Sequence, residues 1–201
     1  MWLFSCVLDR EEQDTVAVEK PELSESLIGF IRRSPMFFIA TAPSGQGGHI
    51  NCSPRPLDWS FFIDSPKRVG WFDLVGSGIE TIAHLKDNGR IVLMFCSFGG
   101  KPLILRVHGS GAVFEPGDDV FEASVSSLDS SLGVRAVVIV EVERVSTSCG
   151  YGVPVMEFVA HRPTINEWLE KKGDEGLVEY RMRNNLVSVD GLAGLDSEKL
   201  R

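Results

Sequence analysis

Several features that would point directly to a function are scarce in this sequence. Its four cysteines (Cys6, Cys52, Cys96 and Cys149) lie far apart, with no Cys-x-x-Cys pair and no His–Cys cluster, so a zinc site is not supported. No apolar run is long enough to span a bilayer. The apolar start, Met1–Leu8, lacks a basic leading segment and runs directly into acidic residues, unlike a secretory signal. We therefore expect a soluble, reduced, cytoplasmic protein with no membrane attachment and no metal site.

The sequence also has fewer basic than acidic residues. The chain has 20 Lys and Arg against 28 Asp and Glu, a net charge of −8, which argues against a nucleic-acid-binding surface. A few backbone N–H groups with one or two cations can still hold a single phosphate at this net charge. Because hydrophobic residues make up 43% of the 201 residues, we expect a folded domain with a real core and room for a terminal helical extension.

The hydrophobic pattern predicts more strands than helices. Helical spacing predicts helices at 21–33, at 77–88 and, as one helix or a helix pair, at 164–185. Many short strands separated by Gly/Pro turns favour a small closed or partly closed β-barrel. The strands are expected at residues 36–42, 49–53, 69–74, 90–95, 103–114, 134–145 and 155–160.

The most informative stretch is Gly70–Thr81, where a strand runs into a Gly-Ser-Gly turn and then a helix. Free N–H groups at the helix start, the helix dipole and the hydroxyls of Ser77 and Thr81 would together form an anion site. The flanking glycines would let the backbone approach a phosphate closely. The other interpretation is a capping box formed by Ser77 and Glu80. Both can hold, because a cap uses only part of the available N–H groups.

A second candidate is a polar strand face. Asn51, Ser53 and Arg55 alternate along an extended segment, so all three side chains point to one side. An amide, a hydroxyl and a guanidinium there could bind a polar ring edge and a phosphate. Alternatively, this is the solvent face of an edge strand that Pro54 and Pro56 terminate.

Arg106 and His108 share one face of a later strand whose opposite face is apolar. Arg106 is a plausible partner for an anion or a carbonyl group. A lone histidine on a strand is more often a satisfied or surface residue than a catalyst, and His108 is interpreted in that way.

Cys149 lies between hydroxyl residues and glycines after a long apolar strand. A reactive thiol needs a neighbouring base or cation to lower its pKa, and none is adjacent in sequence. A tight loop that lines a pocket is therefore favoured over a catalytic nucleophile, although His161 is not far along the chain.

Taken in order, these features resemble the FMN-binding split-barrel superfamily. The closest similarity is to the branch called pyridoxamine 5′-phosphate oxidase family proteins, of unassigned substrate. It runs from about Met36 to Leu192, nearly the whole chain. Its most specific pieces are residues 36–43, 51–55, 76–85, 88–95, 148–154 and 190–192.

The resemblance implies a mainly β (α+β) fold, a six-stranded antiparallel split β-barrel with flanking helices. It also implies a homodimer with FMN at the subunit interface. Residues 1–34 would form an N-terminal segment and helix, and residues 35–162 the FMN-binding split-barrel domain. Residues 163–201 would form a helical extension and tail that pack on the barrel or on the dimer partner.

By this resemblance, the strand at 51–55 would run beside the isoalloxazine and ribityl chain. Ser77 and Thr81 would hold the phosphate, and Arg106 would approach the flavin from the partner subunit. The tail through Asp190 would fold over the partner's pocket. The expected cofactor contacts are Asn51, Ser53, Arg55, Asp73, Ser77, Gly78, Thr81 and Arg106, and the expected substrate-pocket residues are Cys149, Tyr151, Asn185 and Ser188.

The sequence departs from the true pyridoxamine-phosphate oxidases at two places. Gly78 and Glu80 stand where those enzymes have Arg and Lys, and Arg181–Asn185 does not match their C-terminal Arg-x-His element. We therefore expect an FMN-dependent oxidoreductase for an unidentified small organic substrate, not pyridoxal-phosphate synthesis, with no catalytic residue identified. A flavin-binding or sensing module without turnover is one alternative. The other is a haem-binding relative with an axial ligand from among His49, His84, His108 and His161.

Overall fold

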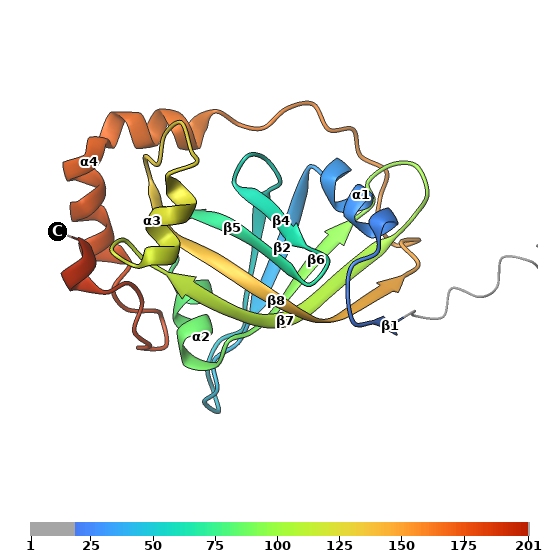
Figure 1. The fold of residues 1–201 in the computed structure, drawn as a ribbon, viewed down its shortest axis with the longest axis horizontal. Helices are drawn as coiled ribbons and strands as arrows, with labels where there is room; N and C mark the ends of the chain where they lie inside the picture. Colours follow the sequence, from blue (N-terminus) through green and yellow to red (C-terminus); the bar gives the residue numbers. More distant parts are fainter. Residues whose placement is uncertain (1–18, 201) are drawn as a thin grey trace, which may run out of the picture.

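An antiparallel sheet occupies the centre of the protein, and helices cover its ends and its underside (Figure 1). The computed structural model describes residues 19–200, so the apolar start at Met1–Leu8 lies outside the described residues. The strands are β1 (Glu19–Lys20), β2 (Met36–Thr41), β3 (Asn51–Pro56), β4 (Phe61–Ser65), β5 (Arg68–Leu74), β6 (Arg90–Cys96), β7 (Ile104–Phe114) and β8 (Val134–Ser148). The helices are α1 (Glu25–Arg33), α2 (Glu80–Asn88), α3 (Asp119–Val125), α4 (Thr164–Asn184) and a 3-10 turn at Ser197–Leu200.

The strand order is β3-β2-β6-β7-β8-β5-β4, and β1 pairs separately with β8. The mainly β class, the antiparallel pairing and the flanking helices are confirmed, but the expected count of six strands is wrong, because seven strands follow the path and β1 is the eighth. The strand on this path that the sequence did not predict is β4, whose mixed polar and apolar residues show no clear alternation. It pairs with β5 through a short turn.

Residues 155–160 do not form the strand that the sequence predicted. These residues are exposed, and the backbone N–H of Met156 bonds to the carbonyl of Phe98 at 2.8 Å without a continuing ladder. A strand needs a hydrogen-bonded partner along its length, and this segment, which lies along the top of Figure 1, has none among the described residues. Cys96 is buried as expected for a strand thiol, whereas Cys52 is exposed.

The inner face of the sheet forms the main core. Alternate residues of each strand are buried there, as in β2, where Phe37 and Ile39 are inaccessible to solvent. Ile31 of α1 and Leu85 of α2 join the same cluster, so both helices close the barrel. Gly111 lets α2 lie close to β7, since a Cβ there would come within 2.7 Å of a Leu85 methyl carbon.

The C-terminal region packs on the same chain. α4 bends at Gly173, whose φ of 61° is open to glycine and strained for other residues, and Leu169 and Leu177 on either side of the bend contact Val75. Farther on, Leu195 and Leu200 pack against α2. The tail is thus attached to the barrel end that carries the turn before α2.

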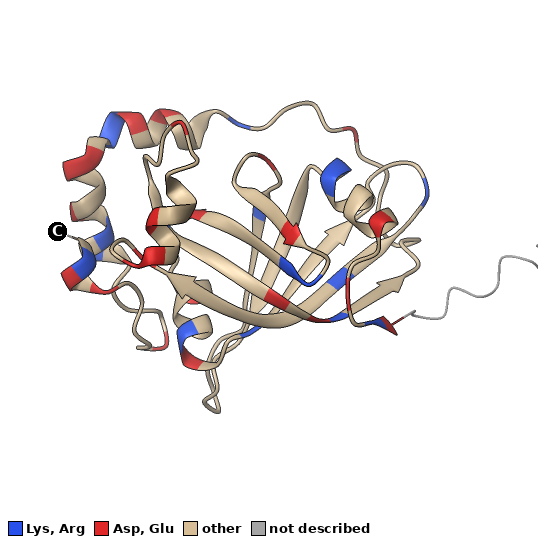
Figure 2. Cartoon of the chain, in the orientation of Figure 1, with Lys and Arg blue, Asp and Glu red and all other residues tan. Residues whose placement is uncertain are grey.

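No helix among residues 19–200 is both long and apolar enough to cross a membrane. Acidic and basic residues alternate along α4 and are sparse along the strands (Figure 2). Single charged residues within the strands therefore stand out, and three of them build the site described below.

Candidate functional site

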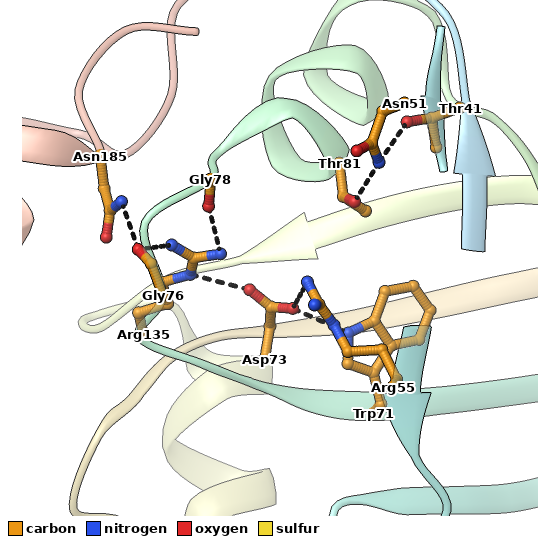
Figure 3. Close-up of polar contacts among 10 residues, drawn as sticks. All are labelled: Thr41, Asn51, Arg55, Trp71, Asp73, Gly76, Gly78, Thr81, Arg135 and Asn185. Carbon is orange, nitrogen blue, oxygen red and sulfur yellow. Dashed lines mark hydrogen bonds and ion pairs between the residues drawn. The ribbon is translucent and has the colours of Figure 1, made fainter. Parts of the chain in front are cut away.

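Asp73, on β5, is the centre of a buried polar cluster (Figure 3). One carboxylate oxygen accepts hydrogen bonds from Trp71 Nε1 at 3.1 Å and Arg55 Nη2 at 3.2 Å. The other accepts from Arg135 Nε of β8 at 2.8 Å. Burial by itself would raise the pKa of Asp73, but the charges of Arg135 and then Arg55, with their hydrogen bonds, outweigh it and hold the pKa below its ordinary value.

Arg135 joins this cluster to the turn before α2. Its Nη1 donates to the carbonyl of Gly76 at 3.2 Å, and its Nη2 donates to the carbonyl of Gly78 at 2.9 Å. Asn185, which is fully buried, also donates to the Gly76 carbonyl, at 2.9 Å. Both carbonyls therefore face the guanidinium. In a trans peptide the next N–H points the opposite way, so the N–H groups of Ser77 and Ile79 face away from Arg135.

Helix α2 begins without a side-chain cap. Its N-cap is Ile79, and no side chain bonds to the first-turn N–H groups. The capping box predicted for Ser77 and Glu80 is wrong, because Ser77 precedes the N-cap by two positions and is exposed. The first turn consequently keeps the unpaired N–H groups that suit an anion. The Glu80 carboxylate lies close by, since a Cβ on Gly78 would come within 2.7 Å of its Oε2.

Asn51, Ser53 and Arg55 point to one side of β3, as the alternation predicts, and that side is the inner face. Their directly opposite partners on β2 are Thr41, Ile39 and Phe37, in that order, and these three are buried in the barrel. Ser53 Oγ is buried and has no hydrogen-bond partner among residues 19–200.

Pro54 lies within β3 and does not end it, whereas the strand does end at Pro56. β3 is a terminal strand of the sheet path, where missing N–H donors are tolerated. The N–H of Leu57 bonds to the Pro35 carbonyl, at the start of β2. The backbone N–H groups of the odd-numbered residues of β3 therefore point toward β2, and the nitrogens of Pro54 and Pro56 lie at the free edge.

A second polar cluster lies where α2 meets the start of β3. Asn51 Nδ2 is 3.0 Å from Thr81 Oγ1 and 3.4 Å from Thr41 Oγ1 (Figure 3). Thr41 Oγ1 is also 3.0 Å from Nδ1 of His84, which is fully buried. The Thr81 hydroxyl is therefore engaged with Asn51, on the inside of the helix.

Arg106 lies on the other face of the sheet from Arg55. Its opposite partner on β6 is Met94, whose opposite partner on β2 is Phe38. All three alternate along their strands with residues buried on the inner face, so they lie on the outer face. Arg106 Nη1 donates to Ser148 Oγ at 3.0 Å. Within one chain, the sheet therefore separates Arg106 from the turn before α2.

The four residues expected in a substrate pocket are not brought together. Cys149 is exposed and follows β8, at the opposite end of that strand from Arg135. Tyr151 is 75% exposed, so its ring is not enclosed by the described residues. Asn185 is at the 76–78 turn, and Ser188 is buried within the tail, where its Oγ accepts the N–H of Leu192 at 3.1 Å.

Asp190 attaches the tail to the loop before β3. Its carboxylate accepts the backbone N–H of His49 at 2.8 Å, and its other oxygen lies 2.6 Å from His49 Nδ1. This contact raises the pKa of His49, mainly through the hydrogen bond and then through the opposite charge of Asp190. The same hydrogen bond lowers the pKa of Asp190. Within the chain, the tail lies on its own barrel.

The four histidines named as haem-ligand candidates have different surroundings. His49 is at the tail contact, His84 is buried beside Thr41, and His108 lies beside Arg144 on the outer face. His161 is exposed in the segment before α4. Among residues 19–200, no group of three or more His, Cys, Asp or Glu side chains is arranged to hold a metal ion.

Sequence reasoning missed Arg135 as a site residue. A signal was present, because Arg135 is a lone charge in a run of buried valines and Asp73 is a lone charge in a neighbouring apolar strand. Charged side chains in such strands are buried only when they are paired. Thr41 and His84 carried no comparable signal, since their contact depends on how α2 docks against β2.

The comparisons with known proteins address the family and the fold. No family model matches the sequence. A protein of Aspergillus flavus, the pyridoxamine 5′-phosphate oxidase family protein ustO, is 40% identical over 191 residues, covering 87% of this chain and 76% of the relative. Crystal structures of Group A Streptococcus HupZ and of a histidine-to-alanine variant of it share the fold. They have TM-scores of 0.50 and 0.51, are 22% and 23% identical, and cover 61% and 62% of this chain and 91% and 98% of theirs. On the strength of the first of these relatives, the chain belongs to the pyridoxamine 5′-phosphate oxidase family.

Proposed function

We propose that the protein binds FMN, with the phosphate on the turn formed by residues 76–79 and the first turn of α2. The observation that carries this proposal is that Arg135 donates hydrogen bonds to the carbonyls of Gly76 and Gly78. Because those carbonyls are held inward, the N–H groups that follow them face outward beside an uncapped helix N-terminus. A phosphate would accept hydrogen bonds from this backbone without displacing a side-chain cap.

The local charge supports an anion even though the whole chain is acidic. The buried carboxylate of Asp73 is balanced by Arg55 and Arg135, so the cluster carries an excess of one positive charge. Arg181 lies near Arg135, and its pKa is lowered by burial and then by the charge of Arg135. The side chain of Arg55 is 29% exposed, so it can reach a ligand while it stays tied to Asp73.

Strand β3 supplies groups suited to the rest of the cofactor. Ser53 Oγ is buried without a partner among the described residues, and it lies on the same face as Asn51 and Arg55. A buried hydroxyl without a partner is costly in free energy, by about 1–3 kcal/mol, and a polar ring edge or ribityl hydroxyl would relieve that cost.

We propose that the protein is an oxidoreductase for a small organic substrate. When bound, FMN supplies the transfer of an electron pair, and the chain supplies binding, orientation and electrostatics. Vitamin B6 chemistry is not proposed. The segment Arg181–Asn185 stands where the true oxidases have their C-terminal substrate element. Asn185 is bonded to the Gly76 carbonyl, and Arg181 is largely buried near Arg135.

We also propose that the protein works as a homodimer that pairs through the outer face of the sheet. Phe38 and Met94 lie side by side on that face, next to Arg106. Both side chains are partly exposed among the described residues, and partly exposed apolar side chains on a sheet face favour association. Arg106 cannot reach the turn before α2 in its own chain, so it would contribute to the partner's site.

Reconstitution tests this function directly. Purified protein incubated with FMN and freed of excess should show the flavin absorption bands, and photoreduced protein should be reoxidised faster by one class of acceptor than by others. Colourless protein would contradict flavin binding. Bound flavin that every acceptor reoxidises equally slowly would indicate a flavin-binding module without turnover.

A further inference from the structure

The cluster of Thr41, Asn51, Thr81 and His84 contains a chain of hydrogen bonds that runs from a buried ring to the candidate site. Thr41, Thr81 and His84 are buried, whereas Asn51 is half-exposed on β3. The only routes from the imidazole toward the ligand side in this cluster pass through Thr41 and then the Asn51 amide. The ring can therefore influence the ligand only through these two side chains.

Counting hydrogens gives one direction in which every donor of the chain finds an acceptor. The NH2 group of Asn51 has two hydrogens and two acceptors, Thr41 Oγ1 and Thr81 Oγ1. The single hydrogen of the Thr41 hydroxyl is then free to point at His84 Nδ1, 3.0 Å away. With Nδ1 as the acceptor, the neutral ring carries its proton on Nε2.

This direction also fixes what Asn51 offers to a ligand. Both amide hydrogens are used on the inner side, so the oxygen Oδ1 points away from Thr41 and Thr81. If His84 instead carried its proton on Nδ1, Thr41 would accept from the ring and donate to the amide, which would favour Oδ1 on the inner side. The position of one buried proton thus selects whether Asn51 presents an acceptor or a donor.

The ring is not explained by packing alone. Nε2 of His84 is buried and has no partner among residues 19–200. An apolar side chain of similar size would fill the same space without an unpaired polar atom. What the imidazole adds at this position is its contact with Thr41.

We propose that His84 is a positioning residue that, through Thr41, holds the Asn51 amide with its oxygen toward the ligand. The site then selects a ligand group that donates a hydrogen bond at this point, such as a ring N–H or a hydroxyl. This inference rests on the proposed flavin site for its ligand, but the orientation of Asn51 belongs to the protein without ligand.

Nitrogen NMR of the ligand-free protein tests the orientation. The expected result is a His84 ring whose neutral form carries its proton on Nε2 and not on Nδ1. The side-chain NH2 signals of Asn51 should be protected from exchange and should change in His84→Leu. A ring protonated on Nδ1, or Asn51 signals that do not respond to His84→Leu, overturns the proposal.

FMN titration tests the consequence. His84→Leu should weaken FMN binding about tenfold, whereas His84→Asn, which places an amide oxygen near the position of Nδ1, should remain within about threefold of the original protein. Ile31→Val is the matched control, because Ile31 is fully buried on helix α1 and lies outside both the cluster and the candidate phosphate site. It should leave both the Asn51 signals and FMN affinity unchanged.

The two claims fail separately. If the original protein does not bind FMN, the proposed function fails and the NMR result alone decides the role of His84. If the original protein binds FMN and His84→Leu binds it equally well, the positioning role is contradicted while the flavin site stands.

Discussion

Asp73 Oδ2 and Arg135 Nε lie 2.8 Å apart in a pair that joins strands β5 and β8, and both side chains are buried. The remaining guanidinium nitrogens of Arg135 hold the turn before α2, and the other Asp73 oxygen holds Arg55. The same pair therefore stabilises the fold and shapes the candidate phosphate site. Changes to it should affect both properties.

Arg135→Met should lower the free energy of unfolding by about 3–5 kcal/mol, because it leaves the Asp73 carboxylate buried without its main partner. Urea denaturation measures this. Arg68→Met is the matched control, since Arg68 on the same sheet bonds to Glu141 at 2.6 Å in a pair that is about half exposed. Removal of that solvent-exposed pair should change the free energy far less, because water screens its charges. Equal effects of the two changes would contradict the structural role of Arg135.

The Asp73 cluster also predicts a loss of stability in acid. The pKa of Asp73 is lowered in the folded protein, so its contribution is fully present above the ordinary pKa of 3.8. It is lost as the pH falls from there through the lowered value. The difference in unfolding free energy between the original protein and Asp73→Asn should therefore shrink over that interval. A difference that stays constant from pH 5 to pH 2 would show that Asp73 is not the group responsible.

The sequence predicted most of the elements of this fold because their signals are local. The alternation in β2 and the apolar spacing of α2 are readable from neighbouring residues, and both elements lie within a few residues of their expected places. The strand at 155–160 was expected for the same reason, but its apolar pattern has no partner within the described part of the chain. Periodicity reports which residues favour burial and does not identify what buries them.

The site was predicted less completely, since it depends on contacts between distant parts of the chain. Ser77 and Gly78 were found because a strand, a glycine turn and a helix are adjacent in sequence. Arg135 is 57 residues away from Gly78, and its role appears only when β8 lies beside β5. Likewise, the predicted capping box is absent because Arg135 bonds to the turn at Gly76, and the helix begins only after Ser77, with Ile79 as its N-cap.

Glu80→Gln should strengthen FMN binding about two- to fivefold. The Glu80 carboxylate lies beside the turn that would hold a phosphate, and repulsion between partly exposed like charges is worth about 0.5–1 kcal/mol. Riboflavin, which lacks the phosphate, should bind equally to both proteins. If riboflavin and FMN gain equally, the carboxylate acts on something other than the phosphate.

The contact between His49 and Asp190 should make the attachment of the tail depend on pH. The pKa of His49 is raised above its ordinary 6.5, so this contribution is fully present below 6.5 and is lost as the pH rises through the raised value. NMR titration should show that Asp190→Asn lowers the pKa of His49, whereas Asp64→Asn, in the β4–β5 hairpin, leaves it unchanged. A His49 pKa that is the same in all three proteins would contradict the contact.

Phe38→Glu should convert the proposed homodimer to a monomer, because it places a charge in the middle of the outer apolar face. Light scattering with size-exclusion chromatography measures the mass. Val189→Glu is the control, since Val189 is 74% exposed on the tail. A dimer that survives Phe38→Glu would place the subunit contact elsewhere, and Arg106→Ala would then have no predicted effect on FMN affinity.

The most direct test of the central claim compares FMN with riboflavin in the original protein and in Ser77→Ala, by fluorescence titration. A phosphate held by the turn at 76–79 predicts that FMN binds at least about tenfold more tightly than riboflavin, since charge-assisted hydrogen bonds are worth about 1.5–3 kcal/mol. Ser77→Ala should narrow that ratio without changing thermal stability. Equal affinities for FMN and riboflavin, or no binding of either, would contradict the assignment of this turn as a flavin phosphate site.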